Sequence, residues 1–296
     1  MSTRELMQLI TATQVTEGAG VIVRRSIGTR QRPHLDPFLM LDHFSSNNPD
    51  DYIAGFPEHP HRGFVTLTYL LDGHMLHHDS MGNRGDLRAG GAQWMKAASG
   101  VIHSEMPQQR EGRMRGFQLW INLPASEKMS EPAYQDIAPE AIPTVEEEGA
   151  LVRVLSGEYA GQRGPVADPH TDLRYLDVTL TAGHALSVPV DADWTVFLYA
   201  FEGEIRLNDK SIAVDQLAVL GPGERVLVQA GSREARFLLV AGRPLREPIV
   251  QYGPFVMNSR AEIEQALADY RDHRLVRHKA RVDEMHGTQA PETGGE

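Results

Sequence analysis

Short apolar segments separated by glycine turns run through most of this chain and restrict the folds that it can adopt. In the first half, strand-length segments lie at residues 20–24, 38–42, 64–71, 75–79, 92–97 and 117–122. Turn dipeptides such as Asp72-Gly73 and Gly90-Gly91 lie between them. Many short strands at regular intervals are typical of antiparallel sandwiches and barrels. The first half therefore predicts an all-β domain.

The second half repeats this pattern. The long apolar segment 194–201 ends in Glu202-Gly203, and a Pro222-Gly223 turn follows, much as Gly90-Gly91 follows Asp72-Gly73. This indicates a weak internal duplication. Between the halves, four prolines interrupt residues 123–149, which favours an irregular linker on the surface.

One helix is predicted near the C-terminal end. Ser259 and Glu262 have the spacing of a capping box. An apolar stripe follows at helical spacing, made of Ile263, Ala266, Leu267 and Tyr270. We expect this stripe to pack on a barrel.

Composition excludes several classes of protein. The 40 acidic and 29 basic residues give a net charge of −11, so we expect no direct nucleic-acid binding. The chain has no cysteine, which excludes disulfides, thiolate metal sites and cysteine nucleophiles. It has no apolar core of a signal peptide and no segment that suits a membrane span. We therefore expect a cytoplasmic protein with no membrane contact.

Two pairs of metal-ligand residues share the same spacing. His59 and His61 lie two residues apart, as do His103 and Glu105. If both segments are extended, each pair points to one face of its strand. Two such strands facing each other inside a barrel would direct three imidazoles and one carboxylate to a common point.

This ligand set suits a catalytic metal. Imidazole binds Fe, Zn, Cu or Ni, and four protein ligands leave two positions of an octahedral ion free for substrate or O₂. Non-haem Fe(II) and catalytic zinc both fit. Isolated H-x-H pairs are also common without metal, so spacing alone leaves both interpretations open. We interpret His74, His77 and His78 as exposed or supporting residues, and the remaining histidines as ordinary: His34, His43, His170, His184, His273, His278 and His286.

At these residues the chain resembles the pirin family of the cupin superfamily. The matching motifs are LDPFLMLDHF (35–44), FPEHPHRGFVTLTYLLDG (56–73), QWMKAASGVIHSEMP (93–107), GFQLWINLP (116–124) and, more weakly, GPFVMNSRAEIEQALADY (253–270). The resemblance covers nearly the whole chain. It implies an all-β bicupin fold: two antiparallel jelly-roll β-barrels packed face to face, with a short C-terminal helical segment.

The resemblance also implies a division of labour between the halves. We expect a metal-binding cupin barrel at 1–125, a linker at 126–149, a metal-free barrel with the helix at 150–284, and a disordered tail at 285–296. Carried over by motif, the metal ligands are His59, His61, His103 and Glu105. The expected cofactor is one divalent metal, Fe(II) by the family's preference, with Zn, Mn, Ni, Co and Cu left open.

One residue departs from the family motif. Pirins commonly have an acid at the position of Val65, in HPHRGFVT. Valine cannot bind a metal. Because the family uses the glutamate of the H-x-E pair, the site should survive, although its redox potential or activity could differ.

Several bacterial pirins resemble quercetin 2,3-dioxygenases, which implies a flavonol substrate and O₂. In that mechanism the metal lowers the pKa of the flavonol 3-hydroxyl, and Glu105 accepts its proton as the catalytic base. Four residues are candidates for an apolar substrate cleft, although core packing is an alternative role for each: Phe56, Phe64, Met106 and Phe117.

Two other functions stay open. Some pirins act as regulators through protein partners, so the iron could serve as a redox sensor without turnover. The third alternative is a cupin that acts on another small oxygenated metabolite. We expect a monomer.

Overall fold

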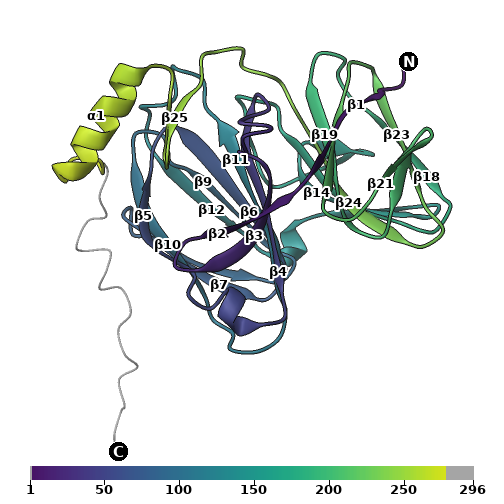
Figure 1. The fold of residues 1–296 in the computed structure, drawn as a ribbon, viewed down its shortest axis with the longest axis horizontal. Coiled ribbons are helices and arrows are strands. Elements are labelled where there is room, and N and C mark those ends of the chain that lie inside the picture. The colour runs from purple at the N-terminus through teal and green to yellow at the C-terminus, as the bar shows by residue number, and fades with distance from the viewer. Residues whose placement is uncertain (1, 278–296) are drawn as a thin grey trace, which may run out of the picture.

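The computed structural model describes residues 2–277, which form two all-β domains and one α-helix (Figure 1). Each domain combines a seven-stranded with a four-stranded antiparallel sheet. This confirms the predicted all-β jelly-roll architecture, although the strands of each domain are divided between two sheets and do not join in one closed barrel. The predicted tail at 285–296, and the end of the second domain at 284, lie outside the described residues.

The first domain contains the two predicted metal-ligand pairs. Its seven-stranded sheet has the order β12 (Ala133–Ile137), β9 (Ala92–Lys96), β6 (Phe64–Asp72), β11 (Met114–Asn122), β4 (Phe38–Ser46), β3 (Val21–Ile27) and β2 (Thr13–Glu17). Its four-stranded sheet has the order β5 (Phe56–His61), β10 (Val101–Pro107), β7 (His74–Asp79) and β8 (Arg84–Arg88).

The second domain has the same plan. Its larger sheet has the order β1 (Leu6–Thr11), β22 (Gln216–Leu220), β19 (Thr195–Glu202), β24 (Ala235–Gly242), β17 (Arg174–Leu180), β14 (Ala150–Ser156) and β13 (Thr144–Glu147). Its smaller sheet has the order β18 (Ala185–Pro189), β23 (Arg225–Ala230), β20 (Ile205–Leu207) and β21 (Lys210–Ile212). The remaining elements are the hairpins β15 (Glu158–Tyr159)–β16 (Gln162–Arg163) and β25 (Val250–Tyr252)–β26 (Phe255–Met257), the 3-10 turns η1 (Pro49–Asp51) and η2 (Pro139–Ala141), and the helix α1 (Arg260–Arg271).

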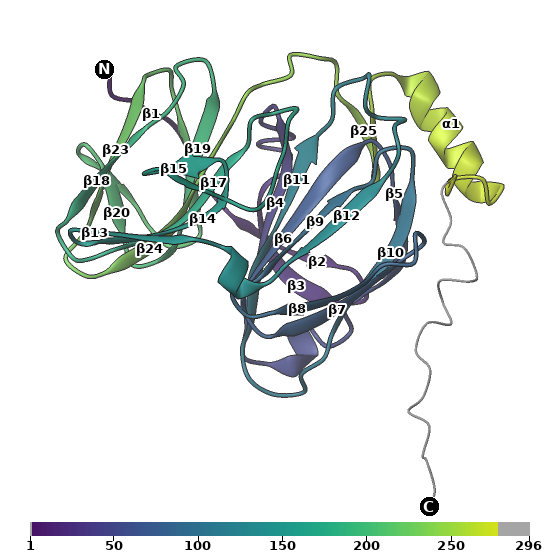
Figure 2. The ribbon, with the colours of Figure 1, turned by 180° about the vertical axis from the view of Figure 1, so that it is seen from behind.

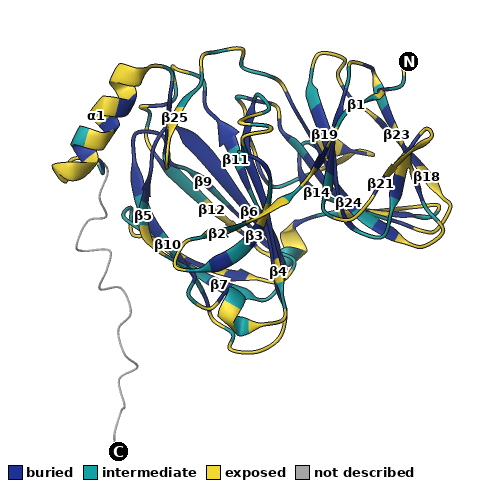
Figure 3. Ribbon diagram, viewed as in Figure 1, coloured by how far each residue is buried: buried dark blue, intermediate teal, exposed yellow. Residues whose placement is uncertain are grey.

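The two seven-stranded sheets pack against each other through one shared hydrophobic core. Residues of both sheets, such as Tyr69 and Phe117 from the first and Tyr175 and Tyr199 from the second, belong to one buried cluster. The phenol of Tyr69 also donates to the Asp177 carboxylate of the other domain at 2.6 Å. The strands that meet between the domains are largely buried (Figure 3). The face-to-face arrangement follows from strand alternation, because these strands bury both of their faces.

The interior of the second domain is filled with hydrocarbon side chains. Val178, Leu198, Val226 and Phe237 all lie in one buried apolar cluster between its two sheets. The corresponding interior of the first domain instead carries histidines and a cavity. This difference explains why the site chemistry is concentrated in the first domain.

The ends of the chain cross over between the domains. Strand β1 pairs with β22 and so completes the sheet of the second domain, and the hairpin β25–β26 and α1 cover the first domain (Figures 1 and 2). Residues 6–11, which the prediction placed in the first domain, therefore pair with the second, and residues 250–271, which it placed with the second, lie against the first. These are long-range pairings, which local sequence patterns do not encode.

The stretch 126–149 is not a plain linker. It contains β12, which pairs with β9 in the first domain, and β13, which pairs with β14 in the second. Pro132, Pro139 and Pro143 lie just outside these strands. The prolines that suggested a linker thus mark strand ends, where a missing N–H costs no ladder hydrogen bond.

The predicted helix is present, and it begins at the predicted N-cap. Ser259 is the N-cap of α1, and its hydroxyl accepts from the backbone N–H of Glu262. The buried face contains Ile263, Ala266 and Asp269, whereas the predicted stripe residues Leu267 and Tyr270 are 38% and 42% exposed. Within residues 2–277, no helix is long and apolar enough to cross a membrane.

Arg4 fixes the crossing N-terminal segment to the second domain. Its side chain is 1% exposed and donates to four backbone carbonyls, those of Asp191, Ala192, Gly221 and Gly223. Replacing Arg4 by alanine leaves these acceptors without their donor, so we expect a loss of about 2 kcal/mol in the free energy of unfolding. Urea unfolding of the metal-free protein measures it. Arg243→Ala, which removes an exposed pair with Asp172, should change stability by less than about 0.5 kcal/mol; an equal loss in both variants would contradict this role of Arg4.

Candidate metal centre

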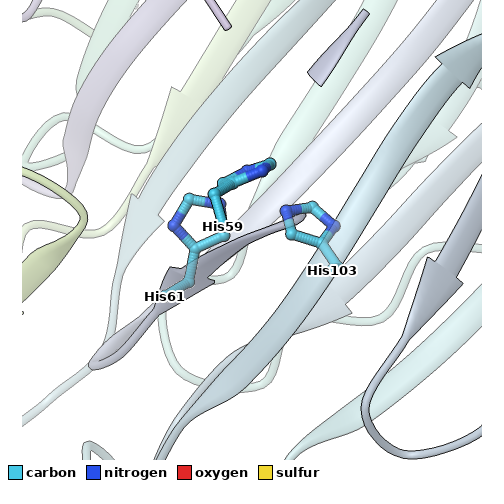
Figure 4. Close-up of side chains that lie close together, drawn as sticks. All are labelled: His59, His61 and His103. Atoms are coloured by element: carbon cyan, nitrogen blue, oxygen red, sulfur yellow. The ribbon is translucent and has the colours of Figure 1, made fainter. Parts of the chain in front are cut away.

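Three imidazoles meet inside the first domain. His59 and His61 lie on β5, and His103 lies on the antiparallel neighbour β10, directly opposite His59. One nitrogen of each ring lies within 4.8 Å of the others, and the ring centroids are 4.4–4.8 Å apart. Figure 4 shows the three rings directed toward one another. The i, i+2 spacing places them together because alternate residues of a strand share a face.

Burial keeps two of these histidines neutral. His61 and His103 are 2% and 1% exposed. Desolvation lowers the pKa of both rings well below the ordinary histidine value, and the neighbouring imidazoles lower it further. Neutral imidazole is the form that binds metals, so the pocket favours ligation over protonation.

The hydrogen bonds leave lone pairs free at the centre. The Nδ1–H of His59 donates to the Pro57 carbonyl at 2.8 Å, which places the lone pair on Nε2. Among the described residues, Nδ1 of His61 and Nε2 of His103 are buried without a hydrogen-bond partner. Unpartnered buried nitrogens are costly unless something binds them. These atoms therefore fit a metal ion.

Glu105 does not lie in this group of three. It forms a second cluster with His77 and His103, in which the ligand atoms again lie within 4.8 Å of one another. The pairing of β10 with β5 shifts register between His103 and Glu105, so that Glu105 lies opposite Phe56. The extra residue lies on β5, because β10 pairs regularly with β7 from His103 to Glu105, and it changes the register of Glu105 relative to the two histidines of β5.

His77 connects His103 to the Asp79 carboxylate. Its Nε2 lies 3.3 Å from the Asp79 carboxylate, and its Nδ1 lies 3.4 Å from Nδ1 of His103. Burial of Asp79 opposes its ionisation, but hydrogen bonds from His77 and Asn83 outweigh this and lower its pKa. The ionised carboxylate accepts from His77, and His77 can then accept from His103. This chain of hydrogen bonds leaves Nε2 of His103 as the nitrogen that can bind a metal ion.

A cavity of about 580 Å³ adjoins the centre. His59, His61 and Glu105 line it, together with Phe56, whereas Phe64, Met106 and Phe117 do not.

The other three cleft candidates have different positions. Phe64 packs on the Trp120 ring at 4.3 Å, behind His61. Met106 follows Glu105 on β10 and therefore points to the opposite, partly exposed face. Phe117 lies in the core between the domains and stacks on His43 at 4.7 Å. Strand alternation accounts for the positions of Met106 and Phe117, and only Phe56 of the four reaches the cavity.

Val65 points away from the centre. Its side chain is 1% exposed and lies in the core that both domains share. Its neighbour Thr66 faces the opposite side of β6, as alternation requires. An acid at this position would therefore enter the domain interface and would not point toward the three histidines.

Three cavity residues were not predicted from the sequence. Thr68 donates to Oε1 of Glu105 at 3.1 Å, and the amide of Gln118 donates to Oε2 at 3.4 Å. Trp120 lies 5.2 Å from the His61 ring and lines the cavity. The sequence does contain a signal for Thr68 and Gln118. Each is a polar residue inside a largely apolar strand, in FVTLTYLL and GFQLWIN.

Comparison with known proteins identifies the family. The family model described as Pirin matches residues 20–121, and the model described as Pirin C-terminal cupin domain matches residues 175–276. A Pseudomonas aeruginosa protein, provisionally named a quercetin 2,3-dioxygenase, is 50% identical over 277 residues, which cover 91% of this chain and 97% of that protein. The chain belongs to the pirin family. A pirin-like protein of Caulobacter vibrioides is 44% identical over 93% of this chain and 100% of its own length.

A solved crystal structure supports the bicupin fold. The crystal structure of quercetin 2,3-dioxygenase from Acinetobacter baumannii is 31% identical and matches with a TM-score of 0.86, covering 93% of this chain and 99% of that chain. Together with the two family models, this confirms both the predicted resemblance and the arrangement of two cupin domains in this pirin.

Proposed function

We propose that this pirin is a metal-dependent dioxygenase that cleaves a flavonol such as quercetin with O₂. The observation that carries the proposal is the convergence of His59, His61 and His103, two of which, His59 and His61, line a cavity of about 580 Å³. A volume of this order suits a ligand of three rings. The names of the relatives from Pseudomonas and Acinetobacter support the substrate class.

In this proposal His59, His61, His103 and Glu105 hold one divalent metal ion. The unpartnered nitrogens of His61 and His103 supply lone pairs, and Glu105 lies within 4.8 Å of His103. Three imidazoles and a carboxylate suit Fe(II), which is the ion that we propose. Bound Fe(II) would supply Lewis acidity toward the substrate hydroxyl and redox chemistry toward O₂.

Glu105 is the proposed base for the flavonol 3-hydroxyl. It is 5% exposed, and its neighbours can stabilise either protonation state. When Glu105 is ionised, the Thr68 hydroxyl and the Gln118 amide donate to its two oxygens. When it is protonated, Glu105 can donate to Thr68, whose hydroxyl also lies 2.5 Å from Oε1 of Gln118. A carboxylate held in this way can take up the substrate proton without moving.

The cavity walls would position a flat substrate and exclude water. Phe56, Trp120, Met40 and Met75 provide apolar surface around the polar centre. The turn between β25 and β26 contributes Pro254, whose backbone contacts the His61 ring. Exclusion of water strengthens the interactions of Glu105 with a bound hydroxyl.

The Glu105→Gln variant tests this role. Glutamine keeps the size of the side chain but cannot accept the proton, so we expect kcat for quercetin to fall by at least about 100-fold. The measurement is the loss of flavonol absorbance under O₂, with protein that has been loaded with Fe(II) and analysed for metal. Glu111→Gln, which changes an exposed loop carboxylate, is the matched control.

Two outcomes would count against the proposal. Equal turnover in wild type and Glu105→Gln would remove Glu105 from the reaction. An iron-loaded wild type that consumes neither quercetin nor O₂ would exclude the dioxygenase, and would favour the alternative of a redox-responsive regulator that acts through protein contacts.

A further inference from the structure

A row of polar side chains crosses the cavity from the metal centre to its far end. Thr68 on β6 lies opposite Gln118 on β11, Gln118 lies opposite Asp42 on β4, and Asp42 lies opposite Arg25 on β3. All four line the cavity. The row begins at Glu105, to which Thr68 and Gln118 are hydrogen-bonded. Polar residues aligned across four neighbouring strands are unusual for the buried face of a sheet.

The far end of the row is an ion cluster with more negative than positive charge. Arg25 donates to both oxygens of Asp42 at 2.7 Å and pairs with Glu17 at 2.8 Å. The Asp42 side chain is 6% exposed, and Glu17 also lines the cavity. Three nitrogens of Arg25 are therefore already engaged by the two carboxylates. Little capacity remains for this guanidinium to bind a ligand anion.

Asp42 retains capacity to accept hydrogen bonds from a ligand. An ionised carboxylate offers about four lone-pair positions, and Arg25 occupies two of them. A hydroxyl that donates to a buried carboxylate forms a charge-assisted bond, which is stronger than one between neutral groups. Ligand hydroxyls suit this end of the cavity, whereas carboxylates and phosphates would be repelled by Asp42 and Glu17.

The separation suits an elongated ligand. Adjacent strands lie about 4.8 Å apart, so Thr68 and Asp42, two strands apart, are separated by about 10 Å. This spacing is close to the length of a flavonol, from its metal-chelating oxygens to the hydroxyls of its remote ring. Phe56 and Trp120 provide apolar surface for the rings between these ends.

We propose that Asp42 determines substrate specificity by accepting hydrogen bonds from hydroxyls on the end of the substrate that lies remote from the metal. The inference rests on the proposed function of the cavity and makes it more specific. The preferred substrate is an uncharged, flat polyphenol with hydroxyls at both ends. Arg25 is a positioning residue, because it holds the Asp42 carboxylate and does not need to contact the ligand.

Two flavonols separate the contribution of the remote hydroxyls. Quercetin carries two hydroxyls on its remote ring, whereas galangin has none, and both present the same chelating oxygens. Binding to the Fe(II) protein is measured without O₂, from quenching of tryptophan fluorescence. We expect wild type to bind quercetin about tenfold more tightly than galangin. This comparison needs no variant and therefore does not depend on the folding of one.

The Asp42→Asn variant then assigns the preference to one residue. Quercetin affinity should fall about tenfold, while galangin affinity should change by less than about twofold, because galangin has no remote hydroxyl to lose. Asp50→Asn, an exposed carboxylate outside the cavity, should leave both affinities unchanged. Equal binding of the two flavonols by wild type, or an unchanged preference in a folded Asp42→Asn protein, overturns the inference.

Oxygen consumption distinguishes this inference from the proposed function. A preference for quercetin that depends on Asp42, without O₂ uptake, supports the specificity role and rejects the dioxygenase. Turnover of both flavonols with equal kcat/KM rejects the specificity role and leaves the dioxygenase standing. If wild type binds neither flavonol, both proposals are wrong.

Discussion

Replacing His103 by alanine is expected to abolish metal binding and, with it, flavonol turnover. His103 is the residue that the two ligand clusters share, so its loss breaks both the trio with His59 and His61 and the group with His77 and Glu105. Loss of residues that merely support a metal ligand typically costs 10- to 100-fold in affinity, so loss of this ligand should cost at least about 100-fold. Elemental analysis after purification from iron-replete cells should show less than about a tenth of the wild-type metal content, by this estimate.

Matched histidine variants decide which cluster binds the metal. His78 lies next to His77 on β7 but is exposed, so His78→Ala should keep the wild-type metal content. If the proposed set is correct, His59→Ala loses the metal, whereas His77→Ala weakens affinity by about 10- to 100-fold as a supporting residue. The opposite result, with metal lost in His77→Ala and retained in His59→Ala, would place the ion in the second cluster. Full metal content in His103→Ala would reject both sites.

Local sequence patterns predicted the parts of this centre that depend on strand geometry. The alternation of side chains along β5 places His59 and His61 on one face, and the same rule places His103 toward the interior. The capping box likewise located the start of α1, because the Ser259 hydroxyl and the N–H of Glu262 are neighbours in sequence. These features need no information about distant parts of the chain.

Features that depend on register and long-range pairing were not predictable in this way. One extra residue of β5 between Phe56 and His59 shifts the pairing with β10, so that Glu105 lies opposite Phe56. The role of His77 depends on the pairing of β7 with β10, which brings it opposite Glu105. Residue spacing in the sequence predicts neither register, because each register depends on which strands become neighbours.

The pairing of each chain end with the other domain also depends on long-range contacts. One of these contacts lies next to the proposed metal centre. Arg62 lies between the proposed ligand His61 and Gly63, and its backbone pairs with the β25–β26 hairpin. Its side chain is 1% exposed and donates to the Asp269 carboxylate of α1 at 2.8 Å and to the Ser99 carbonyl at 2.7 Å. The strand that carries the two proposed ligands His59 and His61 is thus attached to the C-terminal segment by a buried ion pair.

Replacing Arg62 by methionine should destabilise the protein by about 3–5 kcal/mol. Methionine fills much of the same space, but it removes the guanidinium that lies 2.8 Å from the Asp269 carboxylate. Among the described residues, Asp269 then keeps only the Gln265 amide and the Arg277 guanidinium at 3.9 Å, and breaking a buried ion pair is costly. For a protein of this size the loss corresponds to a decrease of roughly 10 °C in Tm. Unfolding of the metal-free protein isolates this effect from metal binding. Hydrogen exchange of the α1 amides then shows whether the helix detaches before the domains unfold.

The double variant Arg62→Met/Asp269→Leu provides the sharpest control. Removing both charges leaves no unpaired carboxylate, so most of the lost stability should return, although the Ser99 carbonyl still lacks its donor. Arg260→Ala, which breaks an exposed helical pair with Glu264, should change stability by less than about 0.5 kcal/mol. If the double variant is as unstable as Arg62→Met, the ion pair is not the cause, and the carbonyl contacts of Arg62 carry the stabilisation instead. Because Arg62 follows His61 directly, detachment of α1 in the single variant should also weaken metal affinity. In the double variant, where α1 stays attached, metal affinity should return.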